Sequence, residues 1–573
     1  MTVKTIPNQA VQIKRGPGAA APPQVYGEVF TKQWVVEVLL DLVGYTVDRD
    51  LGSLTLVEPS AGSGAFLLPA IDRLMHSAAQ NGHGPTTLRT SIRAWEVQPT
   101  HARALRKSIK GLLTQHGVSA SDGTKLANSW VKDGDFLLPA RRDTVRADVV
   151  IGNPPYIRLE DLPRDVSAAY RSAWPTMGGR ADIYVGFIER SLSMLKPGGR
   201  VGFICADRWM RNQYGDRLRQ LVATSYAVEH IWVMHDVDAF EEQVSAYPAI
   251  TVLRNAPQGA AIAADTTCDF TDKPAKQLVR WATKTSESFS AVGVKAHRLP
   301  TWFPGDESWP TGSPARLRLV EELRERFQPL HDPSLGTKVS IGVASGADRI
   351  FVTKDASLVE SDRLLPLAMV KDLAAGEFKW SGHYLVDPWT TSGQLVDLED
   401  YPRLRTYLNG MAAGLRSRHV AKKAEHNWYR TIDKVHSDLT DRPKLLLPDM
   451  HPVIHPVLES GGHYPHHNLY YVISDTWDLE VLGGLLLSKI AQAFIEAYCV
   501  RMRGGTLRFQ AQYLKRIRVP DPVALDHDVA EALRTAFLER DQHAATQTAA
   551  IAYGIDLKGV ASENGMQRTF SAL

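Results

Sequence analysis

Short apolar runs alternate with amphipathic helical stretches between residues 26 and 254, and this alternation is typical of a doubly wound α/β domain. The stretch from Asp182 to Leu195 places apolar side chains at helical spacing, and Pro197-Gly198-Gly199 is expected to end that helix. The predicted strands are Leu54–Val57, Ile92–Trp95, Ala147–Ile151, Val201–Ala206, His230–Met234 and Ala249–Leu253.

The pattern divides the chain into three parts. Residues 1–24 are rich in Pro, Ala and Gly and are expected to form a disordered arm. Residues 25–260 form the predicted Rossmann-like α/β domain, and the segment from Asn255 to Asp265 is predicted to be a linker. Residues 261–573 show mixed α and β patterning and are predicted to fold as an α+β domain with a separate role.

Composition agrees with a multidomain protein of the cytoplasm. The chain has 573 residues, too many for one core, with 44% hydrophobic and 23% charged residues, which is ordinary for a globular protein. Its three cysteines have no CxxC spacing and fit a reducing compartment. The apolar stretch from Leu479 to Val500 contains Lys489 and Glu496, which predicts a buried amphipathic helix and no membrane span. A net charge of +3 permits nucleic-acid binding without requiring it.

A glycine-containing loop follows the first predicted strand and opens a helix. Gly62 and Gly64 allow a tight turn and a close approach to a ligand, at the strand end where α/β sheets bind nucleotides. Glu58 would repel a pyrophosphate, so this loop suits a cationic or polar ligand such as the ammonium group of S-adenosylmethionine. The alternative is an ordinary βα turn that binds nothing.

Two further acids follow later strands. Glu96 ends the second predicted strand, where a carboxylate can accept hydrogen bonds from both ribose hydroxyls. Asp135 could accept from an adenine amino group while Phe136 packs on the ring. Each acid alone is more often a solvated loop residue, and the order of the three is what favours a cofactor site.

The tetrapeptide Asn153-Pro154-Pro155-Tyr156 follows a buried strand directly and is the predicted catalytic loop. Its prolines fix the backbone and leave the Pro154 carbonyl free to point outward, beside the Asn153 side-chain oxygen. Two such acceptors can hold the two hydrogens of an exocyclic amine and favour its pyramidal, nucleophilic form. Tyr156 offers a ring for stacking on the target base. A rigid surface turn is the alternative.

With these motifs in this order, the sequence resembles the γ-class DNA adenine-N6 methyltransferases, the TaqI-like and BseCI-like modification enzymes. Tyr26–Thr31 resembles the leading cofactor segment of that family, with Lys32 where the family usually has proline. The other matching blocks, in order, are Glu58–Phe66, Glu96, Asp135-Phe136, Asn153–Tyr156, Ala181–Tyr184, Leu195–Gly199 and Ala239–Ser245. The cofactor-binding residues that this resemblance and the loop chemistry imply are Thr31, Glu58, Ser60, Gly62, Gly64, Glu96, Asp135, Phe136 and Asn153.

The resemblance implies methyl transfer from S-adenosylmethionine to adenine N6 in duplex DNA, with the base flipped out of the helix. Asparagine at position 153 favours adenine over cytosine N4, whose enzymes more often carry serine there. Phe240 is expected to stack on the flipped base opposite Tyr156; without the resemblance, Phe240 would be taken as a core aromatic.

The second half resembles a target-recognition domain in its weaker landmarks Ile341–Asp348, Asn427–Arg430 and Gly505–Phe509. Two basic stretches there are interleaved with aromatic residues and are predicted to contact DNA phosphates; solvated helix faces are the alternative. The predicted DNA-binding residues are Arg416, Arg418, Lys422, Lys423, Arg501, Arg503 and Arg508.

Five histidines between positions 451 and 467 raise the question of a metal, but Pro452, Pro456 and Pro465 interrupt their spacing and the expected chemistry needs none. No metal is therefore predicted.

The expected partner is double-stranded DNA. The enzyme is expected to be a monomer in the cytoplasm near the nucleoid, and a separately encoded restriction endonuclease is expected to act at the same site. The competing functions are methylation of RNA adenine or of a protein glutamine, and DNA binding by a regulator without activity.

Overall fold

The computed structural model describes residues 29–138, 145–234, 236–242, 247–310, 314–436, 438–501 and 506–555. The chain forms two units, Met1–Pro314 and Ala315–Leu573. The predicted arm, residues 1–24, lies outside the described residues.

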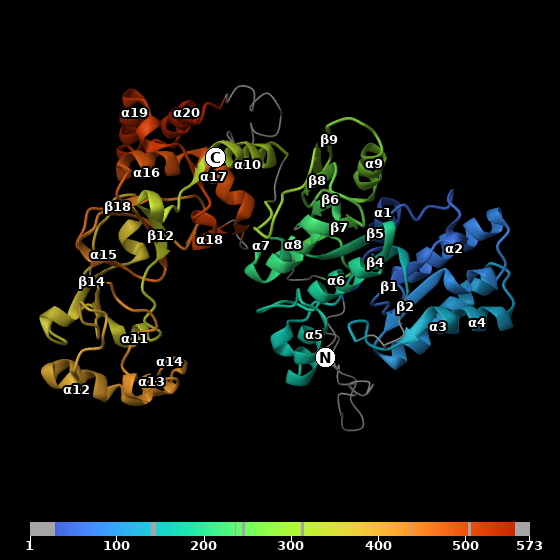
Figure 1. Cartoon of the computed structure of the whole chain (residues 1–573), viewed down its shortest axis with the longest axis horizontal. Helices are drawn as coiled ribbons and strands as arrows, with labels where there is room; N and C mark the ends of the chain where they lie inside the picture. The colour runs from blue at the N-terminus through green and yellow to red at the C-terminus, as the bar shows by residue number, and fades with distance from the viewer. Residues whose placement is uncertain are drawn as a thin grey trace. The chain divides into compact units, whose positions relative to one another are not determined.

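Among the described residues, a ten-stranded sheet organises the first unit (Figure 1). In sheet order its strands are β3 (Val131–Asp133), β2 (Ile92–Glu96), β1 (Leu56–Glu58), β4 (Ala147–Gly152), β5 (Leu195–Ala206), β7 (Pro248–Arg254), β6 (Ala227–Val233), β8 (Ala261–Thr266), β10 (Val294–Leu299) and β9 (Ser288–Ala291). The strands from β3 to β5 are parallel, and β7 runs antiparallel between β5 and β6. The six predicted strands are therefore confirmed, with ends shifted by a few residues.

Helices cover the sheet on both faces. Because the side chains of both faces are buried, the sequences of its strands are unbroken apolar runs. Val149 and Ile151 of β4 pack in the hydrophobic cluster that contains α1, while Val150 between them is equally buried. Because successive side chains of a strand point to opposite faces, both faces of β4 are covered. The helices of this unit are α1 (Gln33–Leu42), α2 (Leu67–Asn81), α3 (Pro99–Gln115), α4 (Ala120–Trp130), α5 (Arg164–Ala173), α6 (Tyr184–Met194), α7 (Arg208–Arg211), α8 (Asp216–Ser225) and α9 (Asp272–Ala282).

The boundary and linker predicted near residue 260 are wrong. Residues 261–266 form β8, which pairs in parallel with β6 and antiparallel with β10, so the sheet continues past the expected linker. The first unit ends at Pro314 for this reason.

The predicted helix over 182–195 is confirmed as α6, but the Pro-Gly-Gly sequence after it is part of a strand. Ala147 pairs with Leu195 and Val149 pairs with Arg200, so the register shifts across residues 196–199. Gly198 takes a φ of 80° within this irregular segment. The three residues therefore make a bulge in β5 instead of a loop.

The second unit is mixed α and β, as predicted. Its described strands form four small sheets. Two of these have four strands each, in the orders β12 (Thr337–Ile341), β20 (Leu469–Ser474), β16 (Lys444–Pro448), β18 (Val457–Glu459) and β13 (Val352–Thr353), β15 (Tyr384–Val386), β14 (Leu364–Ala368), β19 (Tyr464–Pro465). A third sheet has the order β17 (Met450–His451), β22 (Leu507–Arg508), β21 (Val500–Arg501), and β11 (Gln328–Pro329) pairs with β23 (Arg518–Val519). Its helices are α10 (Pro314–Arg326), α11 (Asp348–Phe351), α12 (Pro402–Gly410), α13 (Ala412–Ser417), α14 (His419–Lys422), α15 (Asp438–Asp441), α16 (Leu479–Leu487), α17 (Lys489–Tyr498), α18 (Ala511–Leu514), α19 (His527–Leu538) and α20 (Gln542–Tyr553).

The apolar stretch 479–500 forms two helices, α16 and α17, instead of one. Their axes bend by 67° at Ser488, and most of their side chains are buried in a hydrophobic cluster of the second unit. No single helix in the described part of the chain is long and apolar enough to cross a membrane, although this bent pair passes that test by length and composition together.

Candidate active site

The glycine loop between β1 and α2 has the geometry that close ligand approach requires. Gly62 and Gly64 have φ values of 51° and 95°, a region that side chains other than glycine rarely adopt. A Cβ at Gly64 would lie 2.7 Å from Leu105 of α3, whereas a Cβ at Gly62 would meet no atom within 4 Å. The backbone at Gly62 therefore borders open space, and Gly64 fixes the close packing of α3 against the loop.

Glu96 lies beside this loop, as predicted. One of its carboxylate oxygens accepts from the Gly62 N–H at 2.8 Å, and the other accepts from the Gln98 N–H at 2.7 Å. These bonds hold the carboxylate at the ends of β1 and β2, where its remaining lone pairs can accept from ligand hydroxyls.

Glu58 is an acidic residue buried in the site. Its side chain is 1% exposed, and its Oε2 has no hydrogen-bond partner among the described residues. Burial, with a further contribution from the charge of Glu96, raises the pKa of Glu58 well above its usual range. Two acids in one enclosed corner favour a cation between or beside them. This is the fit expected for S-adenosylmethionine, which carries an ammonium group and a positively charged sulfur.

Asp135 is held by a residue that the sequence interpretation missed. The Tyr170 hydroxyl donates to one Asp135 oxygen at 2.5 Å, and the Leu137 N–H donates to the other at 2.8 Å. Burial raises the pKa of Asp135, partly offset by these hydrogen bonds. Tyr170 lies on α5, far from Asp135 in sequence, and no sequence pattern connects the two residues.

Phe136 is enclosed by aromatic and cationic neighbours. It stacks on Phe187 of α6 with ring centroids 5.2 Å apart and meets the edge of Trp95 at 5.4 Å. The Arg190 guanidinium lies 4.2 Å from its ring centroid. Packing of Phe136 on a ligand ring remains a prediction, and Phe187 is a second aromatic residue here, which the sequence analysis included only among the apolar side chains of the predicted helix over 182–195.

The Asn153 side chain presents its oxygen to the site. Its Nδ2 donates to the Val29 carbonyl at 3.0 Å and to the Thr31 hydroxyl at 3.2 Å. A carbonyl only accepts, so the amide nitrogen must face Val29 and the amide oxygen must face away. That oxygen, Oδ1, is buried and has no partner among the described residues. The Ser60 hydroxyl donates to the Asn153 backbone carbonyl at 3.2 Å and so joins the cofactor loop to the catalytic loop.

Tyr156 completes the predicted loop. Its ring lies 6.3 Å from that of Tyr184 at a tilt of 58°, and its hydroxyl is buried without a partner among the described residues. Burial raises the pKa of Tyr156, so the phenol stays protonated. Pro154 is buried and Pro155 is half-buried, as expected for a rigid turn.

Phe240 packs against the hydrophobic core, and its stacking on the target base remains a prediction. The side chain is 7% exposed and belongs to the cluster that contains α1. Its backbone forms an antiparallel bridge with Thr31, flanked by a hydrogen bond from Lys32 N–H to Ala239 O at 3.0 Å and one from Glu241 N–H to Phe30 O at 2.9 Å. Residues 243–245 of the predicted base-stacking block lie outside the described residues.

Comparison with known sequences identifies the family. Residues 97–240 match the model of the Eco57I restriction-modification methylase. The chain is 43% identical over 537 residues to Type II methyltransferase M.PaeR7I of Pseudomonas aeruginosa, covering 92% of each protein. It is 40% identical over 543 residues to Type II methyltransferase M.XhoI of Xanthomonas vasicola, covering 93% of this chain and 98% of that one. The chain belongs to the Type II methyltransferases.

This Type II methyltransferase is a DNA-methylating enzyme of the restriction-modification class, and its methyl donor is S-adenosylmethionine. The γ-class resemblance is thereby confirmed at the level of the family. The solved structure of the Type IIL restriction-modification enzyme MmeI in complex with DNA superposes on 94% of this chain and 77% of that chain, with a TM-score of 0.55 and 10% identity. That similarity shows a shared fold.

Among the predicted DNA-binding residues of the methyltransferase, Arg418 has a structural role instead. The residue is half-buried, and burial lowers the pKa of its guanidinium. It donates to the backbone carbonyls of Ser345, Leu415, Trp428 and Arg430. The sequence alone could not reveal these hydrogen bonds, because an arginine that binds backbone carbonyls of neighbouring loops cannot be distinguished in a sequence from one that contacts phosphate.

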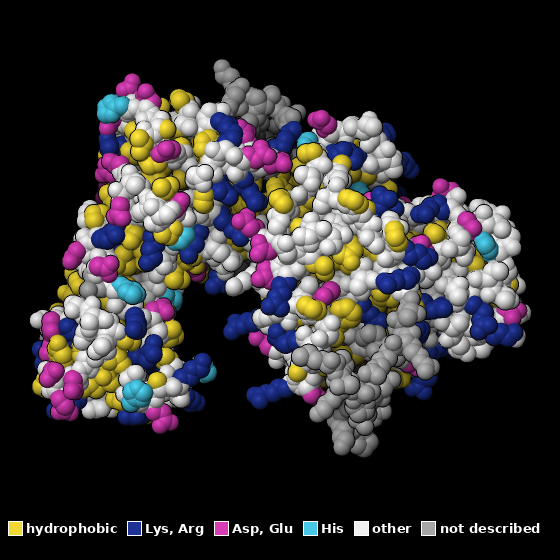
Figure 2. Space-filling model, viewed as in Figure 1, with side chains coloured by type: hydrophobic (Ala, Val, Ile, Leu, Met, Phe, Trp, Pro, Cys, Tyr) yellow, Lys and Arg dark blue, Asp and Glu magenta, His cyan; other side chains and the backbone are white. Residues whose placement is uncertain are grey.

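The other predicted DNA-binding residues are either exposed or outside the described part of the chain. Arg416 on α13, Lys422 on α14 and Lys423 directly after α14 are exposed, in a region where Figure 2 shows Lys and Arg side chains gathered. Arg416 lies 4.5 Å from the Trp428 ring centroid. Arg508 is exposed and lies 3.8 Å from an Asp449 carboxylate oxygen. Arg503 lies outside the described residues, as does the side chain of Arg501.

The five histidines of the second unit lie in three places. His451 stacks on His455 at 4.7 Å, His463 bonds to Glu459 at 3.0 Å, and His466 bonds to Asp348 at 3.1 Å with His467 adjacent. Most of these side chains therefore have ordinary structural partners.

Proposed function

We propose that this enzyme transfers the methyl group to N6 of an adenine that has been turned out of duplex DNA. The observation that carries the proposal is the Asn153 side-chain oxygen, which is buried, unpartnered among the described residues and fixed in orientation by Val29 and Thr31. When bound, S-adenosylmethionine supplies an electrophilic methyl group on a positively charged sulfur. We further propose that the enzyme is a monomer and that a separately encoded endonuclease acts at the same site.

Asn153 provides the acceptor that an adenine amine needs. The lone pair of this amine is delocalised into the ring, so the amine attacks a methyl group poorly while it stays planar. Hydrogen bonds from its two hydrogens to Asn153 Oδ1 and to the Pro154 carbonyl favour the pyramidal form and direct the lone pair away from them. Because the acceptors are fixed before the reaction begins, they stabilise the transition state without a costly rearrangement. After the transfer, the methylated amine remains hydrogen bonded to Asn153 and loses its extra proton to water, so Asn153 does not need to act as a strong base.

Tyr156 supplies the surface against which the base would stack. Its hydroxyl is buried and without a partner among the described residues, so the ring is the part of this side chain available to a base. Target N6 inside a duplex cannot reach a buried oxygen, which makes base flipping a geometric requirement of this site. Phe240, whose side chain packs against the core, is the proposed stacking partner on the other face of the base.

The nature of the product tests this proposal. The purified enzyme is incubated with isotopically labelled S-adenosylmethionine and, separately, with duplex DNA, RNA and a protein extract; the substrates are then digested and the labelled product is identified. Label in N6-methyladenine from duplex DNA is the expected result. Label in N4-methylcytosine, RNA or glutamine would overturn the proposal, and DNA binding without any label would favour a regulator that has lost activity.

A second prediction separates DNA contacts from structural arginines in the second unit. Replacing Lys422 and Lys423 with glutamate is expected to weaken DNA binding and to reduce the slope of log affinity against log salt by roughly 0.9 for each phosphate that the variant no longer neutralises. Replacing Arg418 with alanine is expected instead to lower the free energy of unfolding by about 2–4 kcal/mol, because four backbone carbonyl groups each lose a hydrogen bond from the guanidinium.

The measurements are DNA-binding titrations at several salt concentrations and urea unfolding of each variant. The control is a double substitution of the exposed Lys338 and Lys379 with glutamate, which changes the charge of the protein equally. Equal salt slopes for the two double variants would show that the α14 lysines do not contact phosphates.

A further inference from the structure

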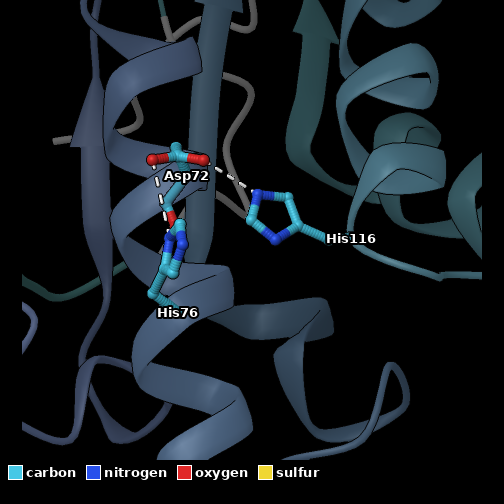
Figure 3. A group of neighbouring side chains, drawn as sticks. All are labelled: Asp72, His76 and His116. Atoms are coloured by element: carbon cyan, nitrogen blue, oxygen red, sulfur yellow. Dashed lines mark hydrogen bonds and ion pairs between the residues drawn. The ribbon is translucent and has the colours of Figure 1, made fainter.

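Three side chains on the surface of the first unit converge in a way that the methyl-transfer reaction does not use. Asp72 and His76 lie one turn apart on α2, and His116 follows the last residue of α3. In Figure 3 the Asp72 carboxylate faces both imidazole rings, one from its own helix and one from the neighbouring helix. We propose that Asp72, His76 and His116 form a binding site for a divalent transition-metal ion of the zinc class.

The distances among these groups are close to those of a metal site. An Asp72 carboxylate oxygen lies 2.8 Å from His116 Nε2, and the other lies 3.5 Å from His76 Nδ1. One potential ligand atom from each residue lies within 4.8 Å of the other two. Ligands of a tetrahedral zinc ion with bonds of about 2.0–2.1 Å lie roughly 3.3 Å apart, so only small side-chain rotations are needed.

The exposure of the three residues allows those rotations. The side chains of His76 and Asp72 are 56% and 49% exposed, and that of His116 is 19% exposed. The His76 and His116 rings are perpendicular, with centroids 5.0 Å apart, so they are not locked in a stack. His76 Nδ1 also lies 2.9 Å from the Asp72 backbone carbonyl, a solvent-exposed hydrogen bond that a metal ligand bond would replace. Water can complete the coordination from the open side, as it does in sites with three protein ligands.

The donor set selects the class of ion. Two imidazoles and one carboxylate suit zinc, nickel, cobalt or copper, whereas magnesium and calcium prefer oxygen ligands and retain more water. With both imidazoles neutral, the single carboxylate leaves the three groups with a net negative charge, which favours a cation.

A second His–Asp group in the protein is less suited to a cation. Asp348 lies beside His466 and His467, but Asp348 and His467 line a cavity of about 530 Å³ together with Arg349 and Arg418. Two arginines at this cavity oppose the entry of a second positive charge. The group on α2 and α3 is therefore the one assigned to the metal.

Metal binding would join two helices that begin at the cofactor site. The glycine loop leads into α2, and Glu96 is followed by α3, whose end lies roughly 25 Å along the helix axis from its start. An ion held by both helices would fix their distal parts to one another. It would therefore stabilise the cofactor-binding half of the first unit without touching the reacting atoms.

Zinc binding by the whole enzyme tests the proposal. Enzyme stripped with a chelator is titrated with zinc chloride by calorimetry, and thermal unfolding is followed with and without zinc. The expected result is that zinc binds, that magnesium at the same concentration does not replace it, and that zinc at a hundredfold excess over its Kd raises the unfolding temperature by about 5 °C.

The variants assign the site. Replacing both His76 and His116 with alanine removes two of the three ligands and is expected to reduce zinc affinity by at least about a hundredfold, which would remove most of the thermal shift. The milder His116→Gln variant, which keeps a partner for Asp72, is expected to lose affinity to a similar degree and guards against a folding defect. His83→Ala, which removes a histidine that pairs with Asp50, is the matched control and should leave zinc binding unchanged.

Two results would overturn the assignment. One is the absence of zinc binding by the unaltered enzyme. The other is zinc binding that survives loss of His76 and His116 but is lost when His466 and His467 are replaced.

Discussion

Replacing Asn153 with alanine is expected to slow methyl transfer by at least about a hundredfold, the loss typical of removing one preorganised group that stabilises a transition state. The variant removes the buried oxygen that accepts from the target amine but leaves the glycine loop and Glu58 in place. Binding of S-adenosylmethionine should therefore change much less than kcat. Single-turnover methylation of duplex DNA, with cofactor affinity measured separately by calorimetry, checks both parts.

The control for this variant is Asn81→Ala. The Asn81 side chain donates only to Ser77 on its own helix, so the same chemical change there should leave the rate unaltered. If the Asn153 variant retained the full rate, the amide oxygen could not be the acceptor and the proposed reaction would fail with it.

Replacing Glu58 with glutamine is expected to reduce the affinity for S-adenosylmethionine by about 10- to 150-fold, the value of one charge-assisted hydrogen bond of about 1.5–3 kcal/mol. The substitution keeps the shape of the side chain and removes only the negative charge that suits a cationic ligand. Calorimetric titration of the cofactor measures the effect. The exposed Glu160, replaced in the same way, is the control for a change in net charge.

The same variant is expected to be more stable than the unaltered enzyme when no cofactor is present. The pKa of Glu58 is raised in the folded protein, so the unfolded chain releases this proton more readily and the folded state loses stability as the pH rises above the usual glutamate range. The gain from glutamine, on the order of 1 kcal/mol for each pKa unit of the shift, should be full above the folded pKa and should shrink as the pH falls toward the usual glutamate range. Urea unfolding at several pH values shows the trend. A variant that is less stable at neutral pH would indicate that Glu58 has a charged partner in the folded enzyme.

The strands and the order of the site residues could be predicted because both are local properties of the sequence. A strand covered on both faces is an unbroken apolar run, and β4 has this pattern immediately before Asn153. Each predicted acid follows a strand, and parallel strands end at one edge of a sheet, so Glu58 and Glu96 were expected to meet there and do.

What could not be predicted depends on partners far away in the chain. Residues 261–266 contain small and polar side chains and read as a linker, yet they form β8 because β6 and β10 supply its hydrogen bonds. Arg418 reads as a phosphate contact, and only the fold shows that four carbonyl groups surround it. The packing of Phe240 in the cluster that contains α1 also depends on distant residues, and its stacking on a base stays a prediction.

The hydrogen bonds from Asn153 to Val29 and Thr31 limit how far this catalyst can be moved into another protein. The methylase segment that the family model recognises, residues 97–240, contains the whole catalytic loop but neither of the residues that orient its amide. A chimera that grafts only that segment would inherit an asparagine free to rotate. Transplanting the activity therefore requires the short stretch around Thr31 as well, although it lies 122 residues before the loop it serves.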